Sequence, residues 1–168
     1  MSRTDECLKQ IETEMGESWL PRIYRETILK MRTRAYSFPA LTRNPEPEIH
    51  HTLLGIELKV GRRRMLCPDL ATARYLAVFA RAGVRSVAVA YDITTISTLA
   101  DQLESSWHRM LLVANDLAKN ESAAFGARLR RQLIGKVGDE IANAGAGRGV
   151  PEFKQSTRQN IEPRKSTN

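Results

Sequence analysis

The feature that most constrains the fold is a long amphipathic pattern between residues 96 and 117. Apolar side chains recur there every three or four residues over about six turns, which places them on one face of a helix. Of the 168 residues, 42% are hydrophobic, which is enough to build a core that covers this face. We therefore predict a folded chain around one long helix, whose buried face holds Ile96, Leu99, Ala100, Leu103, Trp107, Met110, Leu111, Ala114 and Leu117.

Alternating patterns upstream of this helix predict strands. Apolar residues stand at the even positions from 54 to 60, and a turn at Gly61-Arg62 leads into a second short strand over 63–67, so the pair predicts a β-hairpin. Residues 84–91 are apolar on both faces, which is typical of a central strand. Asp69 is placed to cap a helix that runs to Ala82. A right-handed crossover through that helix would bring the strands of Cys67 and Val87 into one sheet as parallel neighbours.

The N-terminal third predicts two helices followed by a loop. Apolar spacing indicates a helix over 4–15 that ends at Gly16, and a second helix that Ser18 caps and whose outer face is basic as far as Arg34. The prolines between 37 and 51 predict an extended loop. A further amphipathic helix is expected over 121–143, and the polar composition from Gly145 onward predicts a mobile basic tail.

Together these elements predict an α+β fold. Its order is two N-terminal helices, a β-hairpin, then helix, strand, helix and helix around a small mixed sheet, with a flexible C-terminal tail. We divide the chain into an N-terminal helical arm at 1–35, a Pro-containing loop at 36–51, an α+β core at 52–144 and a flexible basic tail at 145–168. The patterns leave open whether the arm packs on the core and which oligomeric state the chain adopts.

Positive charge is gathered in two segments of the chain. The net charge is +7, and residues 22–43 and 61–85 each hold six basic side chains and one acidic side chain. Such blocks indicate an anionic partner, and arginine forks match the oxygens of a phosphate backbone. Our leading hypothesis is a non-enzymatic protein that binds nucleic acid, DNA or RNA, or acts within a nucleoprotein complex. The candidate nucleic-acid-binding residues are Lys59, Arg62, Arg63, Arg64, Arg22, Arg25, Lys30, Arg32 and Arg34.

Several other classes of site find no support in the sequence. No P-loop, GxGxxG, GxSxG or CxxC motif is present, and the histidines lack ligand spacing, so we predict no cofactor, no metal and no catalytic residue. The chain has two cysteines and no run of 18 apolar residues, and its first 17 residues carry five acids without an apolar signal region. We therefore expect a cytoplasmic protein that does not bind a membrane.

Two alternative functions remain open. One is a structural or interaction subunit of a larger protein assembly, with Trp19, Tyr36 and Phe38 as anchors near the proline-rich loop. The other is a metal-dependent nuclease, because Glu57-Leu58-Lys59 resembles the (D/E)xK signature of a nuclease superfamily. In that superfamily the core helix follows this strand directly, whereas a second strand intervenes here, and Asp69 and Asp92 would have to supply further metal ligands.

Overall fold

The computed structural model describes residues 1–38 and 46–147, and these residues form an α+β fold, as the sequence predicts. The middle of the predicted loop and nearly all of the predicted tail, residues 148–168, lie outside the described residues. The helices are α1 Arg3–Met15, α2 Leu20–Ile23 with a wider continuation η2 over Tyr24–Ile28, α3 Leu70–Arg81, α4 Ile93–Ala118 and α5 Ala123–Ala144. The strands are β1 Thr33–Ser37, β2 Glu48–Thr52, β3 Gly55–Val60, β4 Arg63–Cys67 and β5 Ser86–Ala90.

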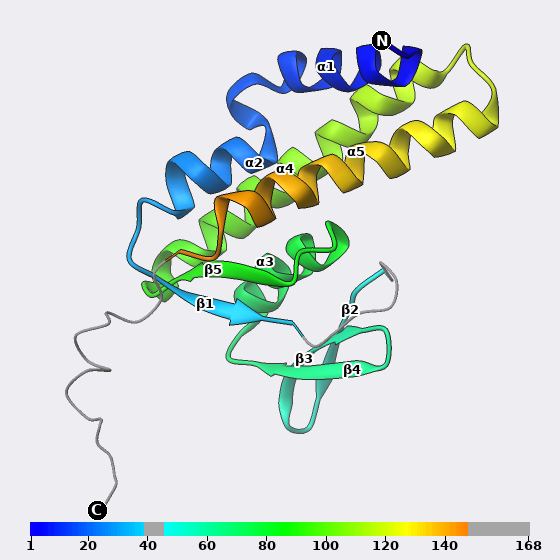
Figure 1. Ribbon diagram of the computed structural model, residues 1–168. Coiled ribbons are helices and arrows are strands. Elements are labelled where there is room, and N and C mark those ends of the chain that lie inside the picture. Colours follow the sequence, from blue (N-terminus) through cyan, green and yellow to red (C-terminus); the bar gives the residue numbers. More distant parts are fainter. Residues whose placement is uncertain (39–45, 148–168) are drawn as a thin grey trace, which may run out of the picture.

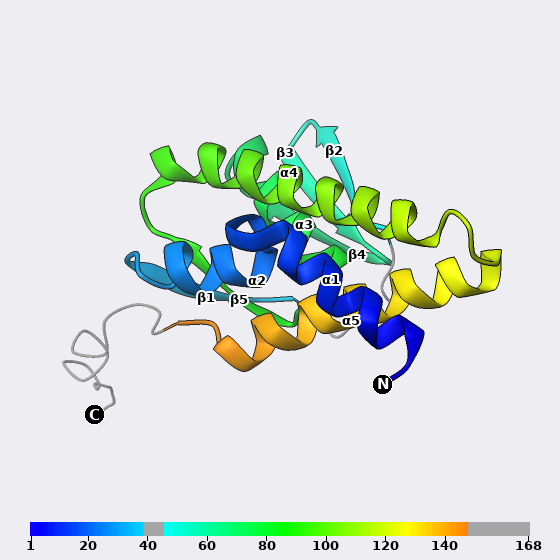
Figure 2. The ribbon, with the colours of Figure 1, turned by 90° about the horizontal axis from the view of Figure 1, so that it is seen from above.

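The elements form a helical layer, a two-stranded ribbon and a separate three-stranded sheet. Figure 1 shows α1, α2, α4 and α5 together on one side of the β1–β5 ribbon, with the β2–β3–β4 sheet at the far side. Seen from above in Figure 2, α1 lies between α4 and α5. The long pattern that predicts a helix over 96–117 corresponds to α4, whose 26 residues span about 39 Å.

The N-terminal helices pack against the core, which settles a point that the sequence leaves open. Ile11 of α1 and Trp19 are buried in the same apolar cluster as the core of α4 and α5. The indole Nε1 of Trp19 donates to Glu140 of α5 at 3.0 Å. Ser2 and Asp5 form a reciprocal capping box at the start of α1, and this cap fixes where the helix begins.

The second N-terminal helix differs from the prediction at both ends. Trp19 occupies its N-cap position, whereas Ser18 lies in the preceding turn, Gly16–Ser18. The helix ends with a widened turn, in which the Leu29 N–H donates to the Tyr24 carbonyl at 2.9 Å. The chain then extends into β1, so the prediction of one basic helix as far as Arg34 is wrong. The pairing of β1 with a strand some 50 residues away overrides the local helical spacing.

The strands form two antiparallel sheets in place of the predicted mixed sheet. β5 pairs with β1, with Ala35 opposite Ala88, and β4 does not join it. The backbone of Ala88 is bonded by side chains: its N–H donates to Tyr24 Oη at 2.9 Å, and its carbonyl accepts from Tyr75 Oη at 2.5 Å. These two hydroxyls bond both backbone groups of Ala88, so a parallel neighbour of β5 would find no vacant donor or acceptor at that residue.

The three-stranded sheet includes a strand that the sequence analysis assigns to a loop. β2 lies within the predicted loop 36–51 and pairs with β3, so that part of the loop prediction is wrong. Ile49, opposite the buried Leu58, is the one apolar side chain in the strand, which leaves no alternating pattern to detect. The predicted hairpin of β3 and β4 is confirmed, with the strand beginning at Gly55.

The remaining helices agree with the predictions. Asp69 caps α3 by accepting from the Thr72 N–H at 2.7 Å, and Asp92 caps α4. α5 crosses the end of α3 very closely, since a Cβ added at Gly138 would lie 2.3 Å from the Ala82 carbonyl oxygen. Within residues 1–38 and 46–147, no helix combines the length and apolar character that crossing a bilayer requires.

Candidate nucleic-acid interface

The basic hairpin carries its charge at one end of the small sheet. Arg62 follows Gly61 in the turn, where Gly61 has a φ of 63° that suits glycine. Arg63 is exposed at the start of β4. No ion pair is recorded for either arginine within the part of the chain that the structure describes. Both guanidinium groups therefore face solvent at the turn.

Acidic neighbours offset part of the charge on the face of this hairpin. Arg64 forms an ion pair with Glu57 at 3.4 Å, and Glu48 of β2 stands opposite Lys59 in the register. Cross-strand neighbours of opposite charge attract each other and reduce the local potential. Of the four hairpin cations proposed from sequence, Arg62 and Arg63 thus keep the most charge for a partner.

The cations of the N-terminal basic segment fall into two groups. Arg22 pairs with Glu26 at 2.9 Å, and Arg25 pairs with Glu140 of α5 at 3.6 Å. The charges of these two arginines are therefore offset by acidic side chains of the helical layer. Lys30 is exposed in the turn that follows η2, between them and β1.

Arg32 and Arg34 lie together on the outer face of the β1–β5 ribbon. Their guanidinium carbons stand 5.0 Å and 5.6 Å from the centre of the Tyr91 ring, and both side chains are exposed. Cation–π contact of this kind holds a guanidinium by its face and leaves its N–H edges free for phosphate oxygens. Neither arginine has a recorded acidic partner among the described residues.

A hollow of about 390 Å³ opens beside Arg34, between the ribbon, the end of β4 and the start of α4. Its walls are mostly apolar or aromatic. Burial raises the pKa of the Cys67 thiol and of the Tyr36 hydroxyl, so both groups are uncharged near neutral pH. The lining residues are Arg34, Ala35, Tyr36, Leu66, Cys67, Pro68, Thr72, Leu76, Val89, Ala90, Tyr91, Ile93 and Ile96.

This hollow links the two basic segments. Leu66 lies on the same face of β4 as Arg64, because side chains two apart on a strand point the same way. Leu66 also lines the hollow together with Arg34. Arg62, in the turn just before β4, is four residues from Leu66, which is about 13 Å at roughly 3.3 Å per residue. The sequence leaves open whether the two segments share a surface; in the fold, Arg34 of the first segment and Leu66, which lies within the second, line one hollow.

The residues proposed for metal-dependent cleavage have other partners. Glu57 pairs with Arg64, while Asp69 and Asp92 each cap a helix. In the described ranges no three histidine, cysteine or acidic side chains gather as a metal site would need. Asp92 accepts from the Thr94 hydroxyl at 2.7 Å and from its N–H at 3.0 Å, and these bonds lower its pKa.

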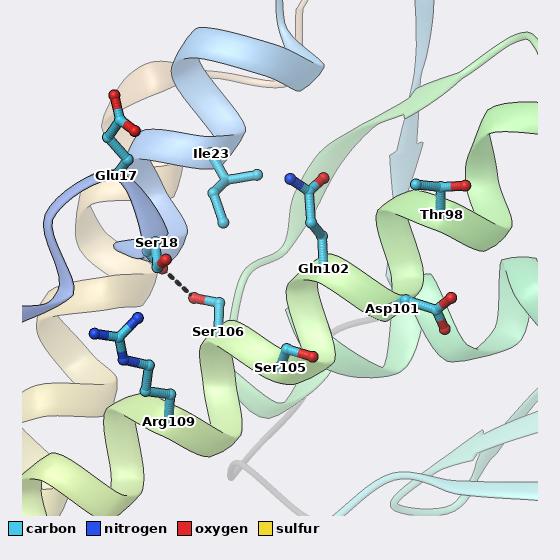
Figure 3. Close-up of a pocket in the computed structure, with 9 residues that line it drawn as sticks. All are labelled: Glu17, Ser18, Ile23, Thr98, Asp101, Gln102, Ser105, Ser106 and Arg109. Carbon is cyan, nitrogen blue, oxygen red and sulfur yellow. Dashed lines mark hydrogen bonds between the residues drawn. The ribbon is translucent and has the colours of Figure 1, made fainter.

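A second hollow, not anticipated from the sequence, lies between the N-terminal turn and α4. It has a volume of about 580 Å³ and polar walls, as Figure 3 shows. Ser106 donates to the Ser18 carbonyl at 2.5 Å, so its hydroxyl joins the two elements. Apart from the buried Ile23, the remaining lining groups are hydrogen-bonding side chains, among them the exposed Ser105 and Arg109. In the sequence, this hollow could have been indicated only by the adjacent serines Ser105 and Ser106. Serines are common on the solvent-exposed faces of helices, so this pair does not predict a site.

Comparison with known proteins gave no relative that could guide the assignment: no family model matches the chain, and no match was found among curated proteins or solved structures.

Proposed function

We propose that the chain binds nucleic acid through a surface that begins at Arg32 and Arg34, passes the hollow and ends at the β3–β4 turn, where Arg62 and Arg63 are exposed. Phosphates lie along the arginines, and the protein acts as a non-enzymatic binding module or within a nucleoprotein complex. The site uses groups from β1, β4 and β5, so only the folded chain assembles it.

One observation carries the proposal: Arg32 and Arg34 both lie over the ring of Tyr91, beside an apolar hollow. Within the described residues, neither arginine forms an ion pair with an acidic side chain. The contact with one ring holds both guanidinium groups side by side on an exposed face. Arginine and aromatic rings at one site are the groups that contact phosphates and bases in single-stranded complexes. The Tyr36 ring packs edge-on against the buried Phe38, with 5.3 Å between the ring centres, which supports Tyr36 beside the hollow.

The expected binding is electrostatic and therefore depends on salt. If Arg32, Arg34, Arg62 and Arg63 each contact one phosphate, the logarithm of the association constant should fall with the logarithm of salt concentration with a slope of about −3. Phosphate contacts set affinity and orientation without reading sequence. Lys59 and Arg64 contribute less because acidic side chains stand beside them.

The experiment is a fluorescence anisotropy titration of labelled single-stranded and duplex DNA and RNA at 50 mM and 200 mM salt. We expect binding that weakens strongly at the higher concentration. The double variant Arg32→Gln/Arg34→Gln should bind at least roughly tenfold more weakly at the lower salt concentration. Its matched control, Arg22→Gln/Arg25→Gln, removes the same charge but alters residues paired with Glu26 and Glu140. Absence of binding to every probe at 50 mM salt would overturn the proposal.

A second candidate function, an interaction subunit of a protein assembly, is favoured by the tip of the β2–β3 hairpin. Leu53 and Leu54 are 107% and 80% exposed there. Adjacent exposed leucines on a hairpin tip are suited to insertion into a partner's apolar pocket. The aromatic anchors expected from sequence do not serve this role, since Trp19 and Phe38 are buried.

The test for this candidate compares two surface changes. Leu53→Ser/Leu54→Ser should abolish recovery of a partner from cells, whereas Leu112→Ser, at an exposed leucine on α4, should not. Equal recovery with both variants would exclude the hairpin tip as the contact. Under either function the expected location is the cytoplasm, in keeping with the free thiols of Cys7 and Cys67.

A further inference from the structure

The hollow beside Arg34 contains a buried polar group without a partner. Thr72 lines it and is 7% exposed; its hydroxyl oxygen has less than 1 Å² of accessible surface and makes no hydrogen bond to any described residue. Its backbone N–H is already bonded, to the Asp69 cap. A buried hydroxyl without a hydrogen-bond partner is destabilising, so such groups are rare and call for an explanation.

The walls around Thr72 suit a flat, largely apolar ligand. Tyr36 and Tyr91 present aromatic rings from the two strands of the ribbon, and Leu66 and Ile93 border the hollow while 63% and 64% exposed. The burial that raises the pKa of Cys67 keeps that wall uncharged. A volume of about 390 Å³ lies at the lower end of the roughly 300–1,000 Å³ typical of small-ligand sites.

The entrance to the hollow is positively charged. Arg34 lines it, and Arg32 stands beside Arg34 over the same Tyr91 ring. A ligand that combines a planar ring with a hydrogen-bonding edge and an attached anion would satisfy each of these groups at once. A nucleotide of a nucleic acid has these three properties.

We propose that this hollow accepts one unpaired base of a single-stranded nucleic acid. The base enters between Tyr36 and Leu66, the Thr72 side chain rotates about χ1 so that its hydroxyl turns from the interior to the polar edge of the base, and the flanking phosphates contact Arg32 and Arg34. This inference rests on the proposed function and specifies its ligand. A base within a duplex is stacked and its pairing edge is occupied, so only an unpaired or extruded base can enter.

The test uses Thr72→Val, which keeps the shape of the side chain and removes the hydroxyl. Affinity for a labelled 12-nucleotide single strand should fall by roughly threefold to tenfold, while affinity for a duplex of the same sequence stays unchanged. Thermal unfolding should show no loss of stability, because the lost hydroxyl has no recorded partner in the described structure. A variant that weakens both ligands equally, or neither, would overturn the inference.

A second measurement follows the fluorescence of a single base in the bound strand. A single strand with one 2-aminopurine should change its emission when bound, as that base leaves its neighbours and enters the hollow. Leu66→Ala, at an exposed position, should reduce this change without preventing folding. Binding without any emission change, at each position of the 2-aminopurine, would refute base insertion and leave phosphate binding intact. Absence of all binding would instead refute the proposed function, so the two failures are distinguishable.

Discussion

Removing one hydroxyl from the core tests the hydrogen bonds that Tyr24 makes to Ala88 of β5 and to Gly145. Tyr24 Oη accepts from the Ala88 N–H at 2.9 Å and donates to the Gly145 carbonyl at 2.6 Å, so Tyr24→Phe breaks both bonds. Burial raises the pKa of Tyr24, so its hydroxyl stays protonated and can donate. The Ala88 N–H is buried and would be left unpaired, which costs about 1–3 kcal/mol, whereas water can reach Gly145 more easily.

We therefore expect Tyr24→Phe to lower the free energy of unfolding by about 2 kcal/mol. At a typical urea dependence of roughly 2 kcal/mol per molar, the unfolding midpoint falls by about 1 M. The assay is equilibrium urea unfolding followed by circular dichroism, with amide exchange at Ala88 as a local probe. Tyr91→Phe is the control, because no hydrogen bond of its hydroxyl is recorded in the described residues. A loss below about 0.5 kcal/mol for Tyr24→Phe would refute the reasoning.

Two further predictions follow from packing and from titration. Gly138→Ala should destabilise the protein by about 1–3 kcal/mol in urea unfolding, because the new methyl group meets the Ala82 carbonyl oxygen, whereas Gly135→Ala, with no atom within 4 Å, should stabilise it by roughly 0.5–1 kcal/mol. Equal effects of the two changes would contradict the close approach of α5 and α3. Hydrogen bonds from Thr94 lower the pKa of Asp92, so this group stabilises the fold above its unfolded pKa of about 4 and loses that contribution as the pH falls through the lower folded value. The melting temperature of Asp92→Asn should consequently fall less steeply below about pH 4 than that of the parent protein, and parallel curves would contradict this assignment.

The helices α1, α3, α4 and α5 could be predicted because their signals are local. The apolar side chains of α4 recur every three or four residues, and this spacing can be seen within the helix itself. Asp69 and Asp92 each cap a helix by accepting from a backbone N–H that lies within three residues. The strands of the ribbon could not be paired from sequence, since β1 and β5 are separated by about 50 residues and by other elements. Tyr24 and Tyr75 read as ordinary core aromatics, and nothing local indicates that their hydroxyls bond to β5.

The candidate site was predictable in composition but not in geometry. The two basic segments are visible in the sequence, yet Arg22 and Arg25 have ion-pair partners while Arg32 and Arg34 lie over Tyr91. These contacts depend on side chains from distant elements. The unpartnered hydroxyl of Thr72 has no sequence signal at all, because a threonine in the first turn of a helix usually has a local partner.

The most direct test of the nucleic-acid interface is the salt dependence of binding to a single strand, measured for the two charge-matched double variants. Arg32→Gln/Arg34→Gln should make the slope of log association constant against log salt concentration shallower by about 1.4, two phosphate contacts at roughly 0.7 each. Arg22→Gln/Arg25→Gln should leave the slope nearly unchanged, because these arginines are paired with Glu26 and Glu140. Equal changes of slope in the two variants would show that binding follows net charge alone, and would contradict an interface built on Arg32 and Arg34.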